Sequence, residues 1–284
     1  MTSSSPSKPS ALLADVLDLD QKLHIVDIGG GRFSQTEEHY KRLVMDAHAR
    51  VTAFDPREDA DLYDLQGSSD WTLVKAAIAD GKPHTLNICA QPGMSSILEP
   101  NIDLMRAYQG FESEMKVVEQ YQVETHRLDD LDAARQADLI KLDIQGAEKL
   151  ALEGACNTLK TTLMVECEVN FIPQYTGQPL FGEIAAQLQS HGFAFHSFMG
   201  YGSRLAKPLA ANDPTDPGSQ WIWSDALFIR ELSQWESLSQ AQLKALCILL
   251  FDVYHVYDFA LKAASWLEDD GLCLQECLRL LDMV

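Results

Sequence analysis

Apolar residues along the chain occur at two spacings, one typical of buried strands and the other of amphipathic helices. Short apolar runs at residues 23–28, 50–54 and 71–78 indicate three strands. Residues 37–47, between the first two strands, have the helical spacing, and residues 60–65 show it weakly. This strand–helix–strand order predicts right-handed crossovers and a parallel sheet with helices on both faces.

The alternation becomes irregular in the middle of the chain and then returns. Residues 85–90, 95–98 and 116–127 have strand-like composition, and the turn residues 91–93 interrupt them. Further strands are predicted at residues 139–144, 162–169, 193–198 and 222–229, and helices at residues 147–153 and 181–190. Seven candidate strands in this order predict the α/β doubly wound, Rossmann-like class, in which ligands bind outside the carboxyl ends of the strands.

The two ends of the chain depart from this alternation. Residues 1–22 are predicted to form a flexible N-terminal tail followed by an edge helix at 11–19, because the first ten residues are polar and rich in Ser and Pro. Residues 23–230 are predicted to form the main domain, and residues 231–284 a helical C-terminal extension. The apolar residues of the extension need a large covering surface, which favours docking on the main domain or a homodimer.

Composition and charge narrow the function classes. With 46% hydrophobic and 23% charged residues, the chain is globular rather than disordered. A formal net charge of −20 repels phosphate backbones and anionic lipid, so neither nucleic acid nor a membrane is expected as a partner. The sequence contains no run of about 18 apolar residues, and its first ten residues lack an apolar signal core. A cytoplasmic location is therefore expected.

The six cysteines lie in apolar stretches without the paired spacing of a zinc site or a disulfide framework. Cys273 and Cys277 are four residues apart and would share one face of a helix. With no histidine beside them, they are interpreted as small buried hydrophobic residues, and no metal site is predicted. Reduced thiols agree with a cytoplasmic location.

A glycine-rich turn follows the first predicted strand. Gly29, Gly30 and Gly31 let the backbone bend and approach a ligand without an intervening Cβ, and Asp27 lies at the strand end before them. A dinucleotide fingerprint would need a further glycine at position 34, where the sequence has Ser34. The pattern Asp-x-Gly-x-Gly instead suits a ligand with positive groups, such as the α-amino and sulfonium groups of S-adenosylmethionine.

Two more acids follow the next predicted strands. Asp55 ends the second strand, and a carboxylate at this place can accept hydrogen bonds from both ribose hydroxyls of a nucleoside. Asp80 follows the third strand, where it can accept the adenine amino group, although Asp-Gly is also a common turn. These acids and the glycine turn, together with Asp143 described next, are the predicted cofactor-binding residues.

Acids also lie in the middle strands. Lys141 and Asp143 share one face of a predicted strand, and Glu166 and Glu168 share one face of the next. Acids inside an apolar strand are costly unless they are paired or placed at a crevice. An ion pair with Lys141 would account for one glutamate but not for the remaining acids.

Methyl transfer from a sulfonium needs alignment of the acceptor and removal of its proton. Asp143 is the first candidate for that base, because it would lie nearest the methyl group, and Glu166 is a second. His126 is a third candidate, although a lone histidine in a strand is more often structural. Carboxylates from Asp143 and Glu166 or Glu168 would also suit a magnesium ion, but no metal is predicted.

The segment Lys141-Leu-Asp143-Ile-Gln145-Gly146-Ala-Glu148 resembles the signature block of FkbM-type methyltransferases. Residues 125–131, 165–169 and 175–181, and the serines at 95 and 96, are also similar to that family, and the resemblance covers about residues 23–198. Many members have glutamate where this chain has Gln145.

The resemblance implies a seven-stranded S-adenosylmethionine-dependent methyltransferase. It further implies O-methylation, with the methyl group passing to a hydroxyl of a sugar, a polyketide or a related small molecule. A non-catalytic nucleoside-binding scaffold of the same fold is the alternative, disfavoured by the intact set of acids and glycines. A nicotinamide oxidoreductase is disfavoured by Ser34 and by the lack of a hydride-relay pair.

Overall fold

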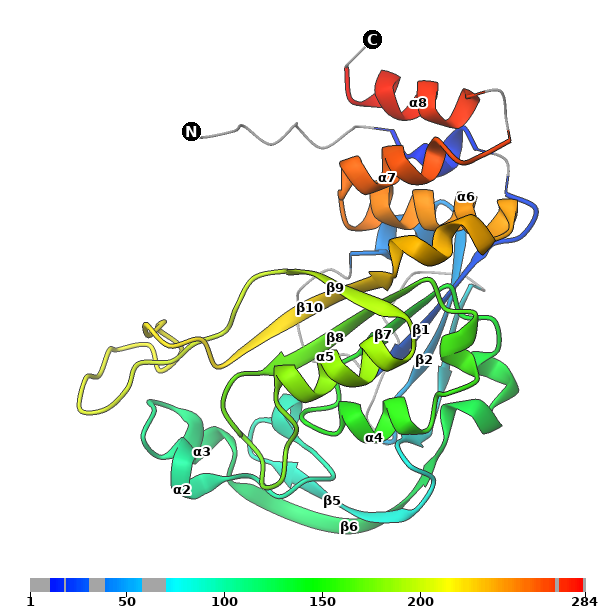
Figure 1. Cartoon of the computed structure of the whole chain (residues 1–284). Coiled ribbons are helices and arrows are strands. Elements are labelled where there is room, and N and C mark those ends of the chain that lie inside the picture. The colour runs from blue at the N-terminus through cyan, green and yellow to red at the C-terminus, as the bar shows by residue number, and fades with distance from the viewer. Residues whose placement is uncertain (1–10, 18, 31–38, 58–69, 269–270, 283–284) are drawn as a thin grey trace.

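The computed structural model describes residues 11–17, 19–30, 39–57, 70–268 and 271–282 (Figure 1). Its main sheet has seven strands in the order β3-β2-β1-β7-β8-β10-β9. Their bounds are β1 Leu23–Ile28, β2 Ala49–Phe54, β3 Trp71–Val74, β7 Leu139–Leu142, β8 Met164–Asn170, β9 Phe193–Phe198 and β10 Trp223–Arg230. The predicted seven-stranded α/β doubly wound sheet is confirmed.

The parallel pairing predicted from the first three strands is confirmed, whereas one later strand of the sheet runs antiparallel. β10 runs antiparallel to both β8 and β9, whereas the pairs among β1, β2, β3, β7 and β8 are parallel. The chain between β9 and β10, residues 199–222, contains no helix that could carry it back over the sheet. Without such a crossover, two strands adjacent in sequence and space pair antiparallel.

The predicted third strand at 71–78 is split between two sheets. β3 ends at Val74, and the two-residue strand β4, Ala77–Ile78, pairs instead with β6, Val117–His126. β6 also pairs antiparallel with β5, Pro83–Cys89, which gives a small sheet of order β4-β6-β5. The strand expected at 95–98 is wrong, because this segment makes only an isolated bridge between Ser96 and Asn87.

Two helices cover one face of the main sheet. They are α4, Glu148–Glu153, and α5, Phe181–Ser190, and both agree with the predicted helices. Leu152 and Leu188 pack there in one buried cluster with Val26, Ile140 and Val165 from the strands. This apolar contact holds α4 and α5 on the face of the sheet opposite the one that the C-terminal helices cover.

The C-terminal segment covers the other face. It contains the 3-10 helix η6, Leu232–Ser237, the π-helix η7, Leu249–Val253, and the helices α6 Gln240–Ile248, α7 Tyr257–Ala264 and α8 Leu272–Leu280. Trp235, Leu246 and Phe251 belong to one buried cluster with Leu23 and Leu139 of the strands. Helices on both faces, as predicted, are therefore present, and the C-terminal segment contributes to the second layer.

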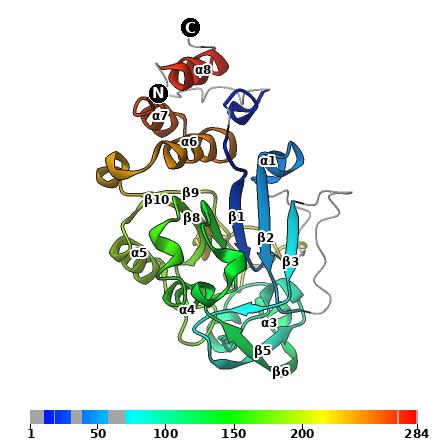
Figure 2. The ribbon, with the colours of Figure 1, turned by 90° about the vertical axis from the view of Figure 1, so that its right-hand side faces the viewer.

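The helices α6–α8 lie at one end of the molecule and the small sheet lies at the other (Figures 1 and 2). The edge helix expected at 11–19 is a single 3-10 turn, η1, Leu13–Asp15. Its amides of Leu13 and Ala14 donate to the carboxylate of Asp252 in η7, at 2.7 and 2.9 Å. The domain boundaries at residues 22 and 230 stay predictions. The buried apolar cluster that contains Trp235 has members on both sides of each boundary.

The remaining helices are short. α1 spans Lys41–Met45, within the helix predicted at 37–47, of which residues 37 and 38 lie outside the described residues. The weak helix predicted at 60–65 also lies outside them. α2, Ile102–Met105, and α3, Phe111–Glu114, lie beside the small sheet (Figure 1).

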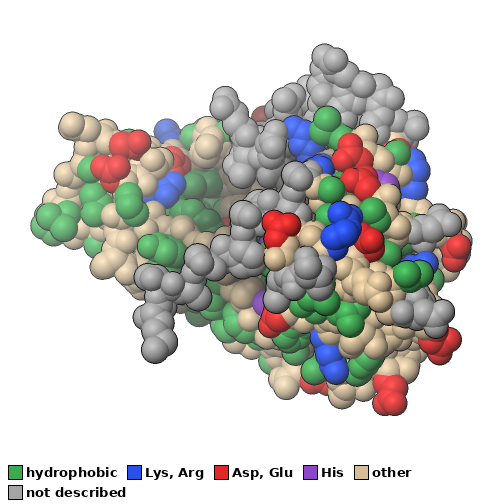
Figure 3. All heavy atoms as spheres, turned by 90° about the horizontal axis from the view of Figure 1, so that it is seen from above, with side chains coloured by type: hydrophobic (Ala, Val, Ile, Leu, Met, Phe, Trp, Pro, Cys, Tyr) green, Lys and Arg blue, Asp and Glu red, His purple; other side chains and the backbone are tan. Residues whose placement is uncertain are grey.

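The face seen from above carries acidic, basic and hydrophobic side chains interspersed, not gathered by sign (Figure 3). Within the described ranges, no helix combines the length and the apolar character needed to cross a membrane.

The fully buried Trp235 tests whether the C-terminal helices share the core of the sheet. Its indole nitrogen donates to the Arg230 carbonyl at 2.8 Å, and its ring packs against Phe259 and Trp266. Trp235→Ala should lower the free energy of unfolding by about 3–5 kcal/mol, measured by urea denaturation.

Trp221, which is 43% exposed, provides the matched control. Trp221→Ala should cost roughly 1 kcal/mol or less. Equal losses for the two variants would contradict the shared core.

Candidate active site

A cavity of about 360 Å³ lies at the carboxyl ends of the central strands, within the size range of small-molecule sites. Its walls come from the ends of β1, β2, β7 and β8, from the small sheet, and from the loop at residues 91–97. The lining includes Gly29, Gly30, Phe54, Asp55, Arg57, Ala76, Ile78, Met94, Ser95, Ser96, Thr125, Lys141, Asp143, Gln145, Glu168, Gln174 and Trp223. This position agrees with the general rule for doubly wound sheets.

The glycine turn packs directly on the end of β7. Gly29 has φ of +91°, and a Cβ added there would lie 1.9 Å from the backbone oxygen of Asp143. Only glycine fits such a position, because both the backbone conformation and the space exclude a side chain. Gly29 and Gly30 line the cavity, whereas Gly31 and Ser34 lie outside the described residues.

Asp27 lies beneath the turn and does not line the cavity. Its carboxylate is buried, accepts a hydrogen bond of 2.5 Å from the Tyr40 hydroxyl, and lies 3.8 Å from the Lys141 ammonium. A Cβ on Gly30 would lie 2.8 Å from this carboxylate. The positive group that Asp27 meets in the structure is therefore Lys141, which itself lines the cavity.

Asp55 lines the cavity as predicted, but its carboxylate is already bound. The Arg57 side chain donates to both oxygens, at 3.0 and 2.6 Å, and the Arg57 amide donates to one of them at 2.9 Å. A carboxylate has about four acceptor positions, so these three bonds leave room for about one more. A ribose at this place would have to share Asp55 with Arg57 or displace the guanidinium.

Two predicted site residues lie apart from the cavity lining. Asp80 forms an ion pair with Lys82 at 2.9 Å and a hydrogen bond with His84 at 2.8 Å. Burial acts to raise its pKa, but hydrogen bonds from His84 and Lys82 lower the pKa of Asp80 to about 2. His126, at the end of β6, is exposed, because alternation along the strand turns the neighbouring Thr125 toward the cavity instead.

Two carboxyl groups face the cavity together, those of Asp143 and Glu168. The side-chain amide of Gln145 donates to both, at 2.8 Å each. Burial, the negative charges of Asp143 and Glu148, and a hydrogen bond with Asp143 together raise the pKa of Glu168 well above its usual range. Gln145 therefore holds the two carboxyls next to each other, and the raised pKa of Glu168 favours the protonated form of that acid beside Asp143.

A third acid extends this pair. Asp225 in β10 lies directly opposite Glu168 in β8. Burial, followed by the charge of Asp143, raises the pKa of Asp225 to about 6. The three carboxyls come from three neighbouring segments of the sheet, so the sheet register brings them together.

Gln145 is held in a strained backbone conformation, with φ of +57°. The Tyr175 hydroxyl lies 3.1 Å from its side-chain oxygen and 2.9 Å from the Met94 carbonyl, which orients the amide. The carboxylate of Glu148 accepts hydrogen bonds from the amides of Ile144 and Gly146, at 3.0 and 3.1 Å. These contacts fix the turn that carries the bridging amide.

Glu166, predicted as catalytic, lies outside the cavity lining. It is buried and accepts a hydrogen bond of 2.8 Å from the Tyr254 hydroxyl, just after η7. Glu166 and Glu168 share a face of β8, as predicted, but only Glu168 is far enough along the strand to reach the cavity. The position at the cavity that was predicted for the Glu166 carboxyl group is therefore occupied by that of Glu168.

The sequence pattern missed the parts played by Asp225, Gln145 and Tyr175. Asp225 carried the same signal as the glutamates of β8, an acid within an apolar strand, and could have been found by it. The bridging by Gln145 and the contact from Tyr175 depend on a turn conformation that no spacing in the sequence specifies.

A doubly wound seven-stranded sheet with a cavity at its carboxyl ends places the protein in the Rossmann-like class. Residues 27–195 match the family described as the methyltransferase FkbM domain, which is more than half of the chain. The chain therefore belongs to the FkbM methyltransferase family, and the resemblance noted from the sequence is confirmed. No match was found among curated proteins.

Solved structures with similarity include a methyltransferase FkbM from Methylobacillus flagellatus, at 13% identity and TM-score 0.39 over 78% of this chain. The chain covers 48% of that protein, about half of its length. A putative methyltransferase from Thermoplasma acidophilum has 10% identity and TM-score 0.37, with coverages of 75% and 70%. The 23S rRNA methyltransferase ErmE has 11% identity and TM-score 0.35, with coverages of 95% and 94%. These scores are low, so the fold assignment rests on the strand order.

Gly29→Ala tests the close approach of the turn to β7. A side chain at this φ costs about 1–2 kcal/mol, and the overlap with the Asp143 carbonyl adds to it. We expect a loss of roughly 2–4 kcal/mol in the free energy of unfolding, measured by urea denaturation. Gly182→Ala in α5 is the control, because its Cβ would meet no atom within 4 Å, and it should stabilise by about 0.5–1 kcal/mol.

Proposed function

We propose that this chain binds S-adenosylmethionine in the cavity and methylates a hydroxyl group of a small molecule or sugar. The observation that carries the proposal is the Asp143–Glu168 pair, which faces the cavity at the strand ends beside the glycine turn. A pair of carboxyls sharing one proton is suited to taking a proton from an acceptor hydroxyl. Family membership supports methyl transfer as the reaction.

The residues present fit this cofactor in part. Gly29 and Gly30 keep the floor of the cavity free of side chains, and Asp55 offers about one remaining acceptor position for a ribose hydroxyl. Phe54 and Ile78 give the cavity an apolar wall suited to an adenine ring. Asp27 would support the turn from beneath, and the adenine contact first predicted for Asp80 is not part of the proposal. S-adenosylmethionine, when bound, supplies a methyl group on a sulfonium centre.

In this proposal Asp143 is the base. Because its pKa is raised, Glu168 keeps its proton to a higher pH than an exposed glutamate, and in this proposal it donates that proton in a hydrogen bond to Asp143. Asp143 would take the proton of the acceptor hydroxyl as that oxygen receives the methyl group that S-adenosylmethionine would supply. Gln145 donates to both carboxyls and so fixes their positions during the transfer.

The cavity wall and the surface charge support a small acceptor. Trp223 and Gln174 line the cavity together, and an aromatic face beside an amide suits the apolar and hydroxyl faces of a sugar. The net charge of −20 disfavours a nucleic-acid substrate. A cytoplasmic location and a homodimer through the C-terminal helices stay predictions.

The deciding experiment combines calorimetric titration with S-adenosylmethionine and a methyl-transfer assay against a panel of hydroxylated sugars and polyketides. Asp143→Asn should lower kcat at least about a hundredfold, as expected for loss of a general base. Glu166→Gln is the matched control, because it keeps an acceptor for Tyr254 outside the cavity, and its kcat should stay near the wild-type value. Absence of S-adenosylmethionine binding would refute the proposal. Binding without methyl transfer to any acceptor would favour the non-catalytic scaffold instead. Full activity of Asp143→Asn would show that another residue is the base.

The raised pKa of Glu168 gives a prediction for the pH dependence of kcat/KM. The protonated form of Glu168 persists to a higher pH than that of an exposed glutamate, and the paired state is lost as pH rises through the raised pKa. The alkaline limb of the profile should therefore fall when Glu168 ionises beside Asp143. In Glu168→Gln, which cannot ionise, this limb should be absent while the acidic limb remains; an unchanged alkaline limb would count against the pair.

A further inference from the structure

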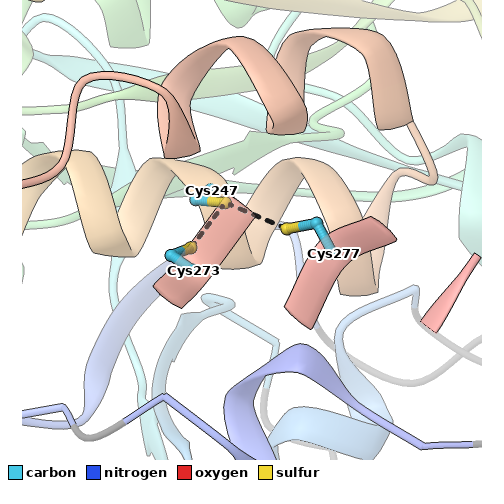
Figure 4. A group of neighbouring side chains, drawn as sticks. All are labelled: Cys247, Cys273 and Cys277. Carbon is cyan, nitrogen blue, oxygen red and sulfur yellow. Dashed lines mark hydrogen bonds between the residues drawn. The ribbon is translucent and has the colours of Figure 1, made fainter. Parts of the chain in front are cut away.

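Three cysteines meet inside the C-terminal helices, far from the cavity in sequence and in space. Cys247 comes from α6, and Cys273 and Cys277 lie one turn apart on α8 (Figure 4). The sulfur of Cys247 is 3.6 Å from that of Cys273 and 3.9 Å from that of Cys277, and all three sulfurs lie within 4.8 Å of one another. Each of the three side chains is fully buried.

These separations suit a shared metal ion. A zinc–sulfur bond is about 2.3 Å long, which places two sulfurs on one ion at about 3.8 Å in tetrahedral geometry and about 4.0 Å in trigonal geometry. A disulfide would instead need sulfurs about 2.05 Å apart. The sequence had indicated plain buried hydrophobic residues, and it could not show that Cys247, 26 residues before Cys273, completes the set.

We propose that Cys247, Cys273 and Cys277 form a three-thiolate site for one thiophilic d¹⁰ metal ion. Thiolates preferentially bind soft metal ions, and the two candidate ions of this kind are Zn(II) and Cu(I). Among the described residues, these three cysteines are the only group of three or more Cys, His, Asp or Glu side chains placed to share an ion. The described residues therefore supply three sulfur ligands and no fourth ligand of these types. Three sulfurs suffice for Cu(I), whereas Zn(II) takes four ligands and would recruit one more.

The site has a structural consequence for the last helix. The buried residues of α8 are Cys273 and Cys277, and its first residue, Leu272, is 61% exposed. A metal bound to both and to Cys247 would fasten α8 to α6 by coordination bonds in addition to packing. Because the small sheet and the cavity beside it lie at the other end of the molecule, this role is independent of the proposed methyl transfer (Figure 1).

The test uses the whole 284-residue chain, reduced and stripped of metal with a chelator. Zn(II) is titrated in one arm against a chromophoric chelator, and Cu(I) in the other against a Cu(I)-specific chelator. One equivalent of at least one ion should bind per chain, with thiolate-to-metal charge-transfer absorption in the Cu(I) arm. Amide hydrogen exchange across residues 272–280 should slow about tenfold or more in the loaded protein, because the ion binds only the docked helix.

Cys273→Ser and Cys277→Ser should each abolish the tight binding and the slowing of exchange. Cys156→Ser, which changes a thiol outside the cluster, should bind as the wild type does. Failure of both ions to bind the wild-type chain at one equivalent would overturn the proposal, and this result does not depend on whether the variants fold. Unchanged binding in Cys273→Ser, or a disulfide within the trio in the freshly purified protein by peptide mapping, would also overturn it.

Discussion

Buried carboxyl groups on neighbouring strands are the constraint on which this structure depends. Each one placed inside the apolar sheet needs a donor, because an ionised and unpaired acid in such surroundings is strongly unfavourable. The donors come from different parts of the chain: Tyr40 donates to Asp27, Tyr254 to Glu166, and Gln145 to both Asp143 and Glu168. The Lys141 ammonium, 3.8 Å from Asp27, adds an ion pair there. Since strand register decides which acids lie side by side, an error of one residue in pairing would leave several of them without partners.

The same requirement links the site to the C-terminal helices. Glu166 and Glu168 lie two residues apart on one face of β8, yet one is satisfied by Tyr254 and the other belongs to the cavity. The C-terminal segment therefore covers the amino-terminal part of this face and ends where the cavity begins. Packing of Trp235, Leu246 and Phe251 on the strands holds that boundary in place.

Sequence patterns predicted the strands of the main sheet well, because strong apolar runs such as those of β1 and β8 leave few alternatives. The same patterns did not predict that residues 71–78 are divided between two sheets. They also gave no direction for β10, because residue types do not encode whether a strand runs parallel or antiparallel to its neighbour. Of the site, Gly29, Asp55 and Asp143 were predicted and line the cavity. Glu168 was noticed but ranked behind Glu166, because a period of two cannot tell how far a strand extends toward its ligand. Asp225 carried the signal of an acid in an apolar strand, but its place beside Glu168 arises from strand pairing across 57 residues of sequence.

The antiparallel strand β10 has a consequence for how this site can change during evolution. Its first residue, Trp223, lines the cavity, and the long segment 199–222 before it is hydrogen-bonded to the sheet near its two ends. The Met199 amide donates to the Asp225 carbonyl, the Phe171 amide donates to the Ile222 carbonyl, and Gly202 forms a bridge with Trp223. Surface segments tolerate insertions and deletions, because lengthening a loop changes the closure entropy only slowly. The rim beside Trp223 can thus be lengthened, shortened or exchanged without altering the strand pairing that positions the carboxyls, so acceptor range and proton transfer can diverge independently.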